Sequence, residues 1–273
     1  MLFHYDDHNP KREVNHAKLR DIFRATAEVT ELSFRERDAV ASFRANGEPL
    51  KALLTKYRMS SVVFDMTVFT KRHLLMMLNW LDDFGCWDRL NIVYTEPQDY
   101  DATAYLPLSF GIAGFEQIPG FAGTPDSSRP LHLLIFLGYE GERALATYEQ
   151  LQPIKTTLVV PHPPFREEWA GRTEEFNKDL ITRVGSRSVV VADSVDPEKV
   201  CASIRGAFGS DDGRSEYAKI LCPLGTKPQA LGAYLYVRRA ADPPALIYSG
   251  PLRHNERFYS HGIGPSWLLQ RQA

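Results

Sequence analysis

Short apolar runs recur along the chain from residue 61 onward, and each is followed by a polar loop and an amphipathic stretch. The clearest runs lie at residues 62–64, 131–137, 156–160, 188–191, 220–222 and 245–248. Runs of this length indicate strands, and apolar positions spaced three or four residues apart between them indicate helices. The run at 131–137 does not alternate with polar residues, which is typical of a central parallel strand. The pattern predicts an α/β fold with an open, mostly parallel sheet and helices on both faces.

Two stretches of the chain, 61–97 and 220–251, share the order strand, loop, helix, strand. In the first, Thr70 and Lys71 open the helix, and in the second Thr226 and Lys227 stand at the same place. Both closing strands end in Tyr-(Thr/Ser)-X-Pro. We therefore predict two similar βαβ units that bring Lys71 and Lys227 to one rim of a single sheet. The alternative is that any two βαβ units share this outline.

The first 60 residues have a different pattern from the rest. Helical spacing at 15–29, 33–44 and 49–57, with a capping-box signal at Ser33 and Glu36, predicts a mostly helical segment over 1–60. The α/β domain then covers 61–273, which could comprise two halves, 61–160 and 161–273. Five glycines and prolines interrupt 108–123, and we expect a long loop there that covers a site.

Composition narrows the class of protein. The net charge is −2, with 32 basic and 34 acidic residues, so no overall field favours nucleic acid or an anionic membrane. Three widely spaced cysteines support neither a disulfide framework nor a metal site. No apolar run is long enough for a membrane span, and the N-terminus lacks a signal-peptide pattern. We expect a cytoplasmic protein.

Polar residues gather where the predicted strands end. In open α/β sheets, ligands bind outside the carboxyl ends of the strands, so these residues define the candidate site. A helix start beside a strand end also favours a phosphate or another anion. The residues predicted at this edge are Asp65, Thr67, Thr70, Lys71, Thr95, Glu96, Glu140, Arg143, His162, Asp193, Ser194, Gly225, Thr226, Lys227 and Ser249.

The stretch PLGTKPQALG (223–232) resembles the Gly-Thr-Lys-Pro signature of CARF domains, the Rossmann-like sensors of CRISPR-associated and other prokaryotic defence proteins. FDMTVFTK (64–71) resembles the strand-end Asp-X-Thr motif of the same superfamily. The resemblance implies a Rossmann-like fold and a phosphorylated nucleotide-like ligand, for instance a cyclic oligonucleotide. Thr226 and Lys227 would then hold phosphate, and Asp65 and Thr67 would line the pocket. A homodimer or a protein partner, and no cofactor, are expected.

Two other functions fit parts of the same sequence. VVFDMTVFT, NIVYT and VVVADSVD resemble motifs of haloacid-dehalogenase-type, Mg²⁺-dependent phosphohydrolases. Asp65 would be the nucleophile, Thr95 a phosphate ligand, and Asp65, Asp193 and Asp196 would hold Mg²⁺. The third alternative is a protein-interaction subunit that uses 97–125 and 253–267 as an interface. The motifs GxSxG, GxxxxGK[ST] and GxGxxG do not occur, which leaves catalysis open but favours a binding protein.

Overall fold

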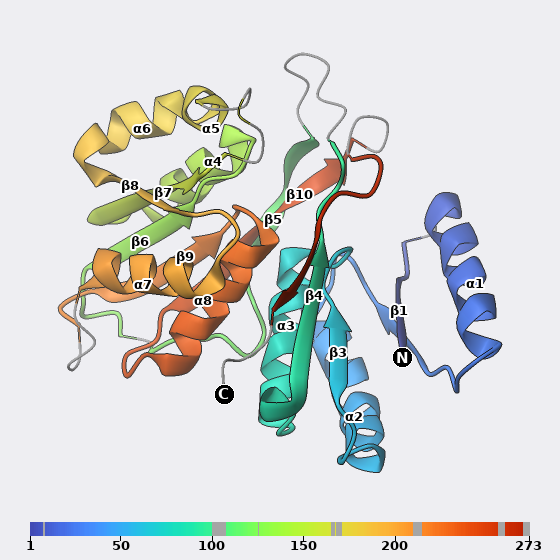
Figure 1. Ribbon diagram of the computed structural model, residues 1–273. Helices are drawn as coiled ribbons and strands as arrows, with labels where there is room; N and C mark the ends of the chain where they lie inside the picture. Colours follow the sequence, from blue (N-terminus) through green and yellow to red (C-terminus); the bar gives the residue numbers. More distant parts are fainter. Residues whose placement is uncertain are drawn as a thin grey trace. The chain divides into compact units, whose positions relative to one another are not determined.

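The computed structural model describes residues 1–7, 9–99, 108–124, 126–164, 167, 171–209, 215–255 and 260–269 (Figure 1). The chain forms two compact units, Met1–Val62 with Asn79–Arg89, and Val63–Leu78 with Leu90–Ala273. The predicted division at residue 60 therefore differs from the observed one mainly in residues 79–89, which belong to the first unit. No helix among the described residues is long and apolar enough to cross a membrane.

The first unit combines two helices with a parallel strand pair. Its elements are β1 (Leu2–Tyr5), α1 (Pro10–Arg24), β2 (Glu31–Phe34) and α2 (Ala39–Lys56). Its core is aromatic: Phe34 and Phe43 stack on Trp80, with ring centroids 6.5 and 4.9 Å away. Such offset stacks add to the stabilisation from buried area.

The prediction of three helices in this unit is wrong. Ser33 lies in β2, where Leu32 and Phe34 are buried and Ser33 is exposed. That alternation is the two-residue period of a strand, so the predicted capping box does not form. The observed helix, α2, begins after Asp38, whose carboxylate accepts a hydrogen bond from the Ala41 N–H. It then continues through Pro49, and the predicted segments 33–44 and 49–57 are thus partly merged in α2.

The second unit contains a six-stranded sheet in the order β5-β10-β9-β6-β7-β8. The strands are β5 (Ser109–Gln117), β6 (Leu131–Phe136), β7 (Lys155–His162), β8 (Val189–Asp193), β9 (Ala218–Pro223) and β10 (Ala245–His254). Five of them are parallel and β5 pairs antiparallel with β10. The prediction of an open, mostly parallel Rossmann-like α/β sheet is confirmed.

Helices cover both faces of this sheet, as predicted. Figure 1 shows α7 and α8 together on one face and α4, α5 and α6 on the other. Their bounds are α4 Gly141–Leu151, α5 Arg172–Phe176, α6 Lys178–Val184, α7 Pro197–Phe208 and α8 Lys227–Arg239. Every residue of α8 from Pro228 to Tyr236 is buried. A side chain at Gly232 would lie 2.5 Å from Val200 of α7, so glycine is required for the two helices to pack this closely.

The two βαβ units exist, but they belong to different sheets. The first consists of β3 (Val62–Asp65), α3 (Lys71–Asp83) and β4 (Leu90–Thr95), and its strands form a three-stranded sheet with β11 (Ser266–Leu269). The second, β9-α8-β10, lies in the six-stranded sheet. The prediction of a single sheet is therefore wrong. Strand pairing is decided by long-range contacts that the local pattern does not contain.

The predicted loop at 108–123 is largely a strand. β5 pairs with β10 along nearly its whole length, and β10 continues to His254, beyond the expected end at Tyr248. Gly111 and Gly114 have positive φ values of 63° and 157°. The register shifts between Gly250 and Pro251. Glycines at such irregularities mask a strand's periodicity, which explains why the sequence pattern indicated a loop.

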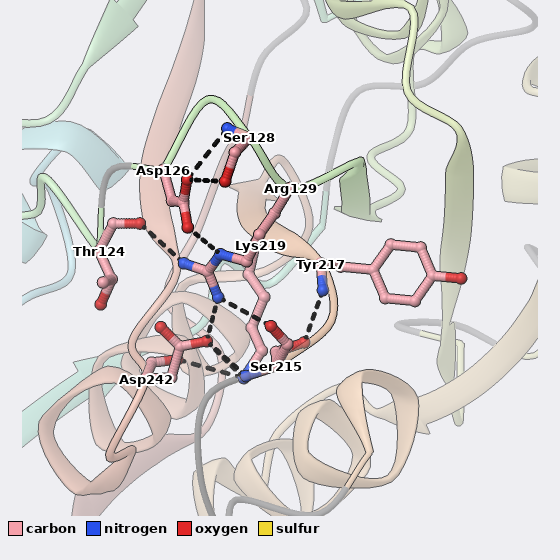
Figure 2. Close-up of polar contacts among 8 residues, drawn as sticks. All are labelled: Thr124, Asp126, Ser128, Arg129, Ser215, Tyr217, Lys219 and Asp242. Carbon is pink, nitrogen blue, oxygen red and sulfur yellow. Dashed lines mark hydrogen bonds and ion pairs between the residues drawn. The ribbon is translucent and has the colours of Figure 1, made fainter.

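A buried ionic network joins the loops at the amino ends of β6 and β9 (Figure 2). Arg129 Nη1 donates to Asp242 Oδ2 at 2.8 Å and to the Ser215 carbonyl at 3.0 Å. Arg129 Nε lies 3.2 Å from Asp126, and Lys219 Nζ donates to the Asp242 carbonyl at 3.2 Å. Because each charge has an opposite charge or a carbonyl in reach, the network can persist away from water.

Candidate functional site

The chain adds its parallel strands first on one side of β6 and then on the other. β6 comes first in the chain among them, β7 and β8 lie on one side of it, and β9 and β10 lie on the other. The crevice outside the carboxyl ends of β6 and β9 is therefore the topological switch point, where open α/β sheets bind ligands.

A cavity of about 370 Å³ lies at this switch point. Its wall includes residues directly after β6, from Leu137 to Glu140, and directly after β9, from Leu224 to Lys227. Lys71, at the start of α3, and Tyr94 of β4 also line it. The volume falls in the range of small-molecule pockets, roughly 300–1,000 Å³. The cavity can thus hold one small organic ligand.

Glycines let the two loops pass close to each other. A side chain at Gly138 would lie 2.9 Å from the Leu224 carbonyl oxygen, and one at Gly225 would lie 2.0 Å from Gln229 Oε1. A side chain at Gly138 would meet backbone, and one at Gly225 would displace the Gln229 side chain from its hydrogen bond to Thr226, so glycine is favoured at both positions. The two loops therefore approach each other closely beside the cavity.

The N-terminus of α8 is closed by a capping box. The Thr226 hydroxyl accepts from the Gln229 N–H at 3.2 Å, and Gln229 Oε1 accepts from the Thr226 N–H at 3.0 Å. The hydroxyl also donates to the Ser194 carbonyl at 2.7 Å, which ties α8 to the loop after β8. The Thr226 hydroxyl, predicted to hold phosphate, is thus engaged within the protein. At this β9–α8 junction, the charged side chain that lines the cavity is that of Lys227.

Two lysines from distant parts of the chain line the cavity. Lys71 Nζ donates to the Leu224 carbonyl at 3.0 Å, and no hydrogen bond or ion pair of Lys227 Nζ is found among the described residues. Burial, followed by the positive charges of Arg143 and Lys227, lowers the pKa of Lys71 to about 7. Burial also lowers the pKa of Lys227 to about 8, although Asp65 opposes the shift. Both ammonium groups therefore lack a full complement of negative charge.

Arg143 provides a third cation, held by the first turn of α4. Its Nη1 donates to the Ser249 carbonyl at 3.1 Å, and its Nη2 lies 3.3 Å from Glu140 Oε2. Glu140 also accepts from the Ser109 hydroxyl at 3.2 Å. The side chains of Arg143 and Glu140 are only 9% and 11% exposed, so the pair is fixed in position at the cavity wall.

The predicted site residues divide into two groups. Six line the cavity, namely Lys71, Glu140, Arg143, Gly225, Thr226 and Lys227, and His162 and Ser194 of the predicted edge lie there too. Seven do not: Asp65, Thr67, Thr70, Thr95, Glu96, Asp193 and Ser249. Of the second group, the Ser249 carbonyl accepts a hydrogen bond from Arg143 and Asp193 ends β8, whereas the others come from the three-stranded sheet and its loops.

The polar residues of the three-stranded sheet bond mainly to one another. Asp65 accepts from the Thr67 N–H at 2.9 Å, and the Thr67 hydroxyl accepts from the Thr95 N–H at 2.9 Å. Glu96 accepts from Trp267 Nε1 at 2.9 Å. At the start of α3, the Thr70 hydroxyl lies 2.9 Å from His73 Nδ1. These contacts shape turns and helix starts, a usual role for such residues.

The carboxylates of the phosphohydrolase alternative are not brought together. Asp193 accepts from the N–H groups of Val195 and Asp196 at 2.9 and 2.8 Å, and Asp196 caps α7. Among the described residues, no group of three or more His, Cys, Asp or Glu side chains could hold a metal ion. Asp65, Asp193 and Asp196, all within that part of the chain, therefore do not form the expected Mg²⁺ set.

Several residues of the cavity wall were not predicted from the sequence. Tyr139 follows β6 directly, so the strand-end rule could have found it. Tyr248 and His254 lie in β10, and Arg172 and Glu174 in the short helix α5. Helix α5 has no strand-end or motif signal of its own, and its place at the cavity depends on tertiary packing.

Fold and cavity together define a Rossmann-like α/β protein with a cationic cavity at its switch point. A scan against protein-family models gave no match, and a search of the curated proteins gave none either.

Proposed function

We propose that the protein binds a phosphorylated, nucleotide-like ligand in this cavity and acts as a sensor or accessory subunit of a prokaryotic defence-type system. One observation carries the binding proposal: Lys71, Arg143 and Lys227 meet at one cavity wall with Glu140 as the carboxylate among them. Enclosed like charges are unfavourable without counter-charge. An anionic group at this place would remove the imbalance.

The rest of the wall suits the organic part of a nucleotide. Tyr139, His162 and Tyr248, which have aromatic rings, and Pro164 also line the cavity. Flat aromatic groups stack on nucleobases with little preference for sequence. A phosphate held at the lysines, with a base among these rings, would use both parts of the cavity.

The sensor role is supported by the CARF resemblance. The Gly-Thr-Lys-Pro stretch, Gly225 to Pro228, lies at the β9–α8 junction and contributes to the cavity wall. The second resembling stretch contributes Lys71, whereas Asp65 and Thr67 lie outside the wall. The proposed ligand contacts are accordingly Lys71, Arg143 and Lys227, with a protein partner or a second copy completing the system.

Ligand-induced thermal stabilisation of the full chain tests this function. The panel contains nucleoside mono-, di- and triphosphates and cyclic oligonucleotides. A true ligand at a hundredfold excess over its dissociation constant adds about 2.7 kcal/mol of stability. The stabilisation should disappear in Lys227→Met and persist in Lys178→Met, because Lys178 is an exposed lysine of α6. No response to any member, or a response that Lys227→Met retains, would refute the proposal.

A further inference from the structure

We infer that the cavity selects the dianionic end of a phosphate monoester over a phosphodiester, through the combined charge of Lys71, Lys227 and Arg143. This inference rests on the proposed function and names the class of ligand that the site takes. It favours a mononucleotide with a terminal phosphate over a cyclic nucleotide.

The balance of charge in the cavity wall carries the inference. The wall contains four cations, Lys71, Arg143, Arg172 and Lys227, and two carboxylates, Glu140 and Glu174, and so has an excess of two positive charges when all are ionised. A phosphate monoester carries about −1.5 to −2 at pH 7, whereas a diester carries one negative charge per phosphate. A monoester therefore neutralises the fully protonated wall. A diester neutralises only one of the two excess charges, so the second lysine is either uncompensated or neutral and one charge-assisted interaction is lost.

The hydrogen bonds within the wall leave room for such a ligand. Lys71 and Arg143 each donate one hydrogen bond to a backbone carbonyl, of Leu224 and Ser249 respectively. Arg143 Nε has no partner among the described residues, and neither hydrogen bond nor ion pair is found there for Lys227 Nζ. The wall thus keeps charge-assisted donors for the phosphate oxygens, and such bonds are the stronger kind.

The empty cavity reduces its own charge by losing protons. Because the pKa of Lys71 is about 7 and that of Lys227 about 8, both lysines are partly neutral at pH 8. A bound dianion favours their charged forms and raises both pKa values. Binding of a monoester is therefore coupled to uptake of protons.

Other titratable groups face the same cavity and belong in the interpretation of its pH dependence. Around the two ammonium groups lie Asp65 of β3, Cys222 of β9, Glu140 and Arg143. Further along the wall are His162, Arg172, Glu174, Tyr248 and His254. The proton count is best measured at pH 8, where a phosphate monoester, whose second pKa is about 6, is a dianion.

Isothermal titration of the full chain tests the selectivity. The probes are the four common nucleoside 5′-monophosphates, their 3′,5′-cyclic counterparts and inorganic phosphate. We expect at least one monophosphate to bind about tenfold or more tightly than its cyclic counterpart, since charge-assisted bonds to a dianion are the stronger. Equal or tighter binding of the cyclic form would overturn this inference and leave the proposed function intact. If no nucleotide binds, both are refuted.

A second readout measures the protons. At pH 8, titrations in buffers of different ionisation enthalpy should show uptake of about one proton per monoester, as expected for lysines with pKa values near 7 and 8. The affinity should fall above pH 8, where the lysines lose their charge, and below pH 6, where the phosphate becomes a monoanion. Lys71→Met should reduce the uptake and Lys178→Met should leave it unchanged. Binding without proton uptake in the wild-type chain would overturn the inference.

Discussion

Replacement of Asp242 by asparagine tests whether the ionic network at the amino ends of β6 and β9 stabilises the sheet. Asp242→Asn keeps the size and one oxygen acceptor but removes the negative charge. Arg129 and Lys219 have side chains that are 9% and 2% exposed, and the remaining carboxylate of the network, Asp126, pairs with Arg129. Two buried cations would thus have lost their common partner.

The expected cost follows from this burial. Removal of one partner from a buried ion pair costs about 3–5 kcal/mol, and asparagine keeps an acceptor, so we expect about 3 kcal/mol. An exposed pair provides the control: Glu149 and Arg183 are 2.5 Å apart and each is 52% exposed. Glu149→Gln should cost less than about 1 kcal/mol.

Hydrogen exchange followed by mass spectrometry reports on the right part of the chain, because peptides from β6 and β9 lie in the second unit. At about 1.4 kcal/mol for each factor of ten, Asp242→Asn should accelerate their slowest exchange by about a hundredfold. Burial alone would raise the pKa of Asp242, but bonds from Arg129 and the Ser215 N–H hold it below its usual value. The contribution of ionised Asp242 to the free energy of unfolding is therefore fully present above its unfolded pKa of about 3.9. It is lost as the pH falls through the folded pKa. Equal exchange in Asp242→Asn and Glu149→Gln would refute this account.

Three further predictions concern the loops and lysines around the cavity. Thr226→Ala should lower stability in thermal melts by about 1–2 kcal/mol, since it opens the α8 capping box, whereas Thr226→Ser keeps the hydroxyl and most of the stability. Gly141→Ala, whose new carbon would lie 2.0 Å from a carbonyl oxygen of α5, should cost about 1–3 kcal/mol. Gly206→Ala, with open space around it in α7, should stabilise by about 0.5–1 kcal/mol instead. The unfolded chain binds more protons at Lys71 than the folded one above pH 7, so the stability of the empty protein should rise toward pH 10. Lys71→Met should reduce this rise and Lys178→Met should not; an unchanged slope in Lys71→Met would contradict the assigned burial.

The sequence predicted the fold best where one local signal dominates. The non-alternating run at 131–137 became the central strand β6, and Pro197 and Pro228 mark the first turns of α7 and α8. The same pattern analysis failed for β2 and β5. β2 has only four residues, and glycines in β5 interrupt the alternation of apolar positions. A strand as short as β2 carries too little local information to outweigh a helical pattern nearby, and the glycines of β5 give it the pattern of a loop.

The candidate site could be predicted only in part for a related reason. Loops after β6 and β9 meet at the cavity because their strands are neighbours in one sheet, and the strand-end rule places their residues correctly. The rule misled for the loops after β3 and β4, because these strands pair in another sheet. Sheet membership depends on pairing between residues far apart in sequence, which periodicity does not encode. Lys71 nevertheless lines the cavity, because it lies at the start of α3 and not in the three-stranded sheet itself.

The contribution of Lys71 and Tyr94 from outside the six-stranded sheet affects how the chain can be divided. A fragment that begins at residue 108 would retain all six strands and most of the cavity wall. It would nevertheless lack one cation and one aromatic ring of the cavity wall. Recombination or excision of the Rossmann-like sheet as a module would thus transfer the sheet without the complete cavity wall.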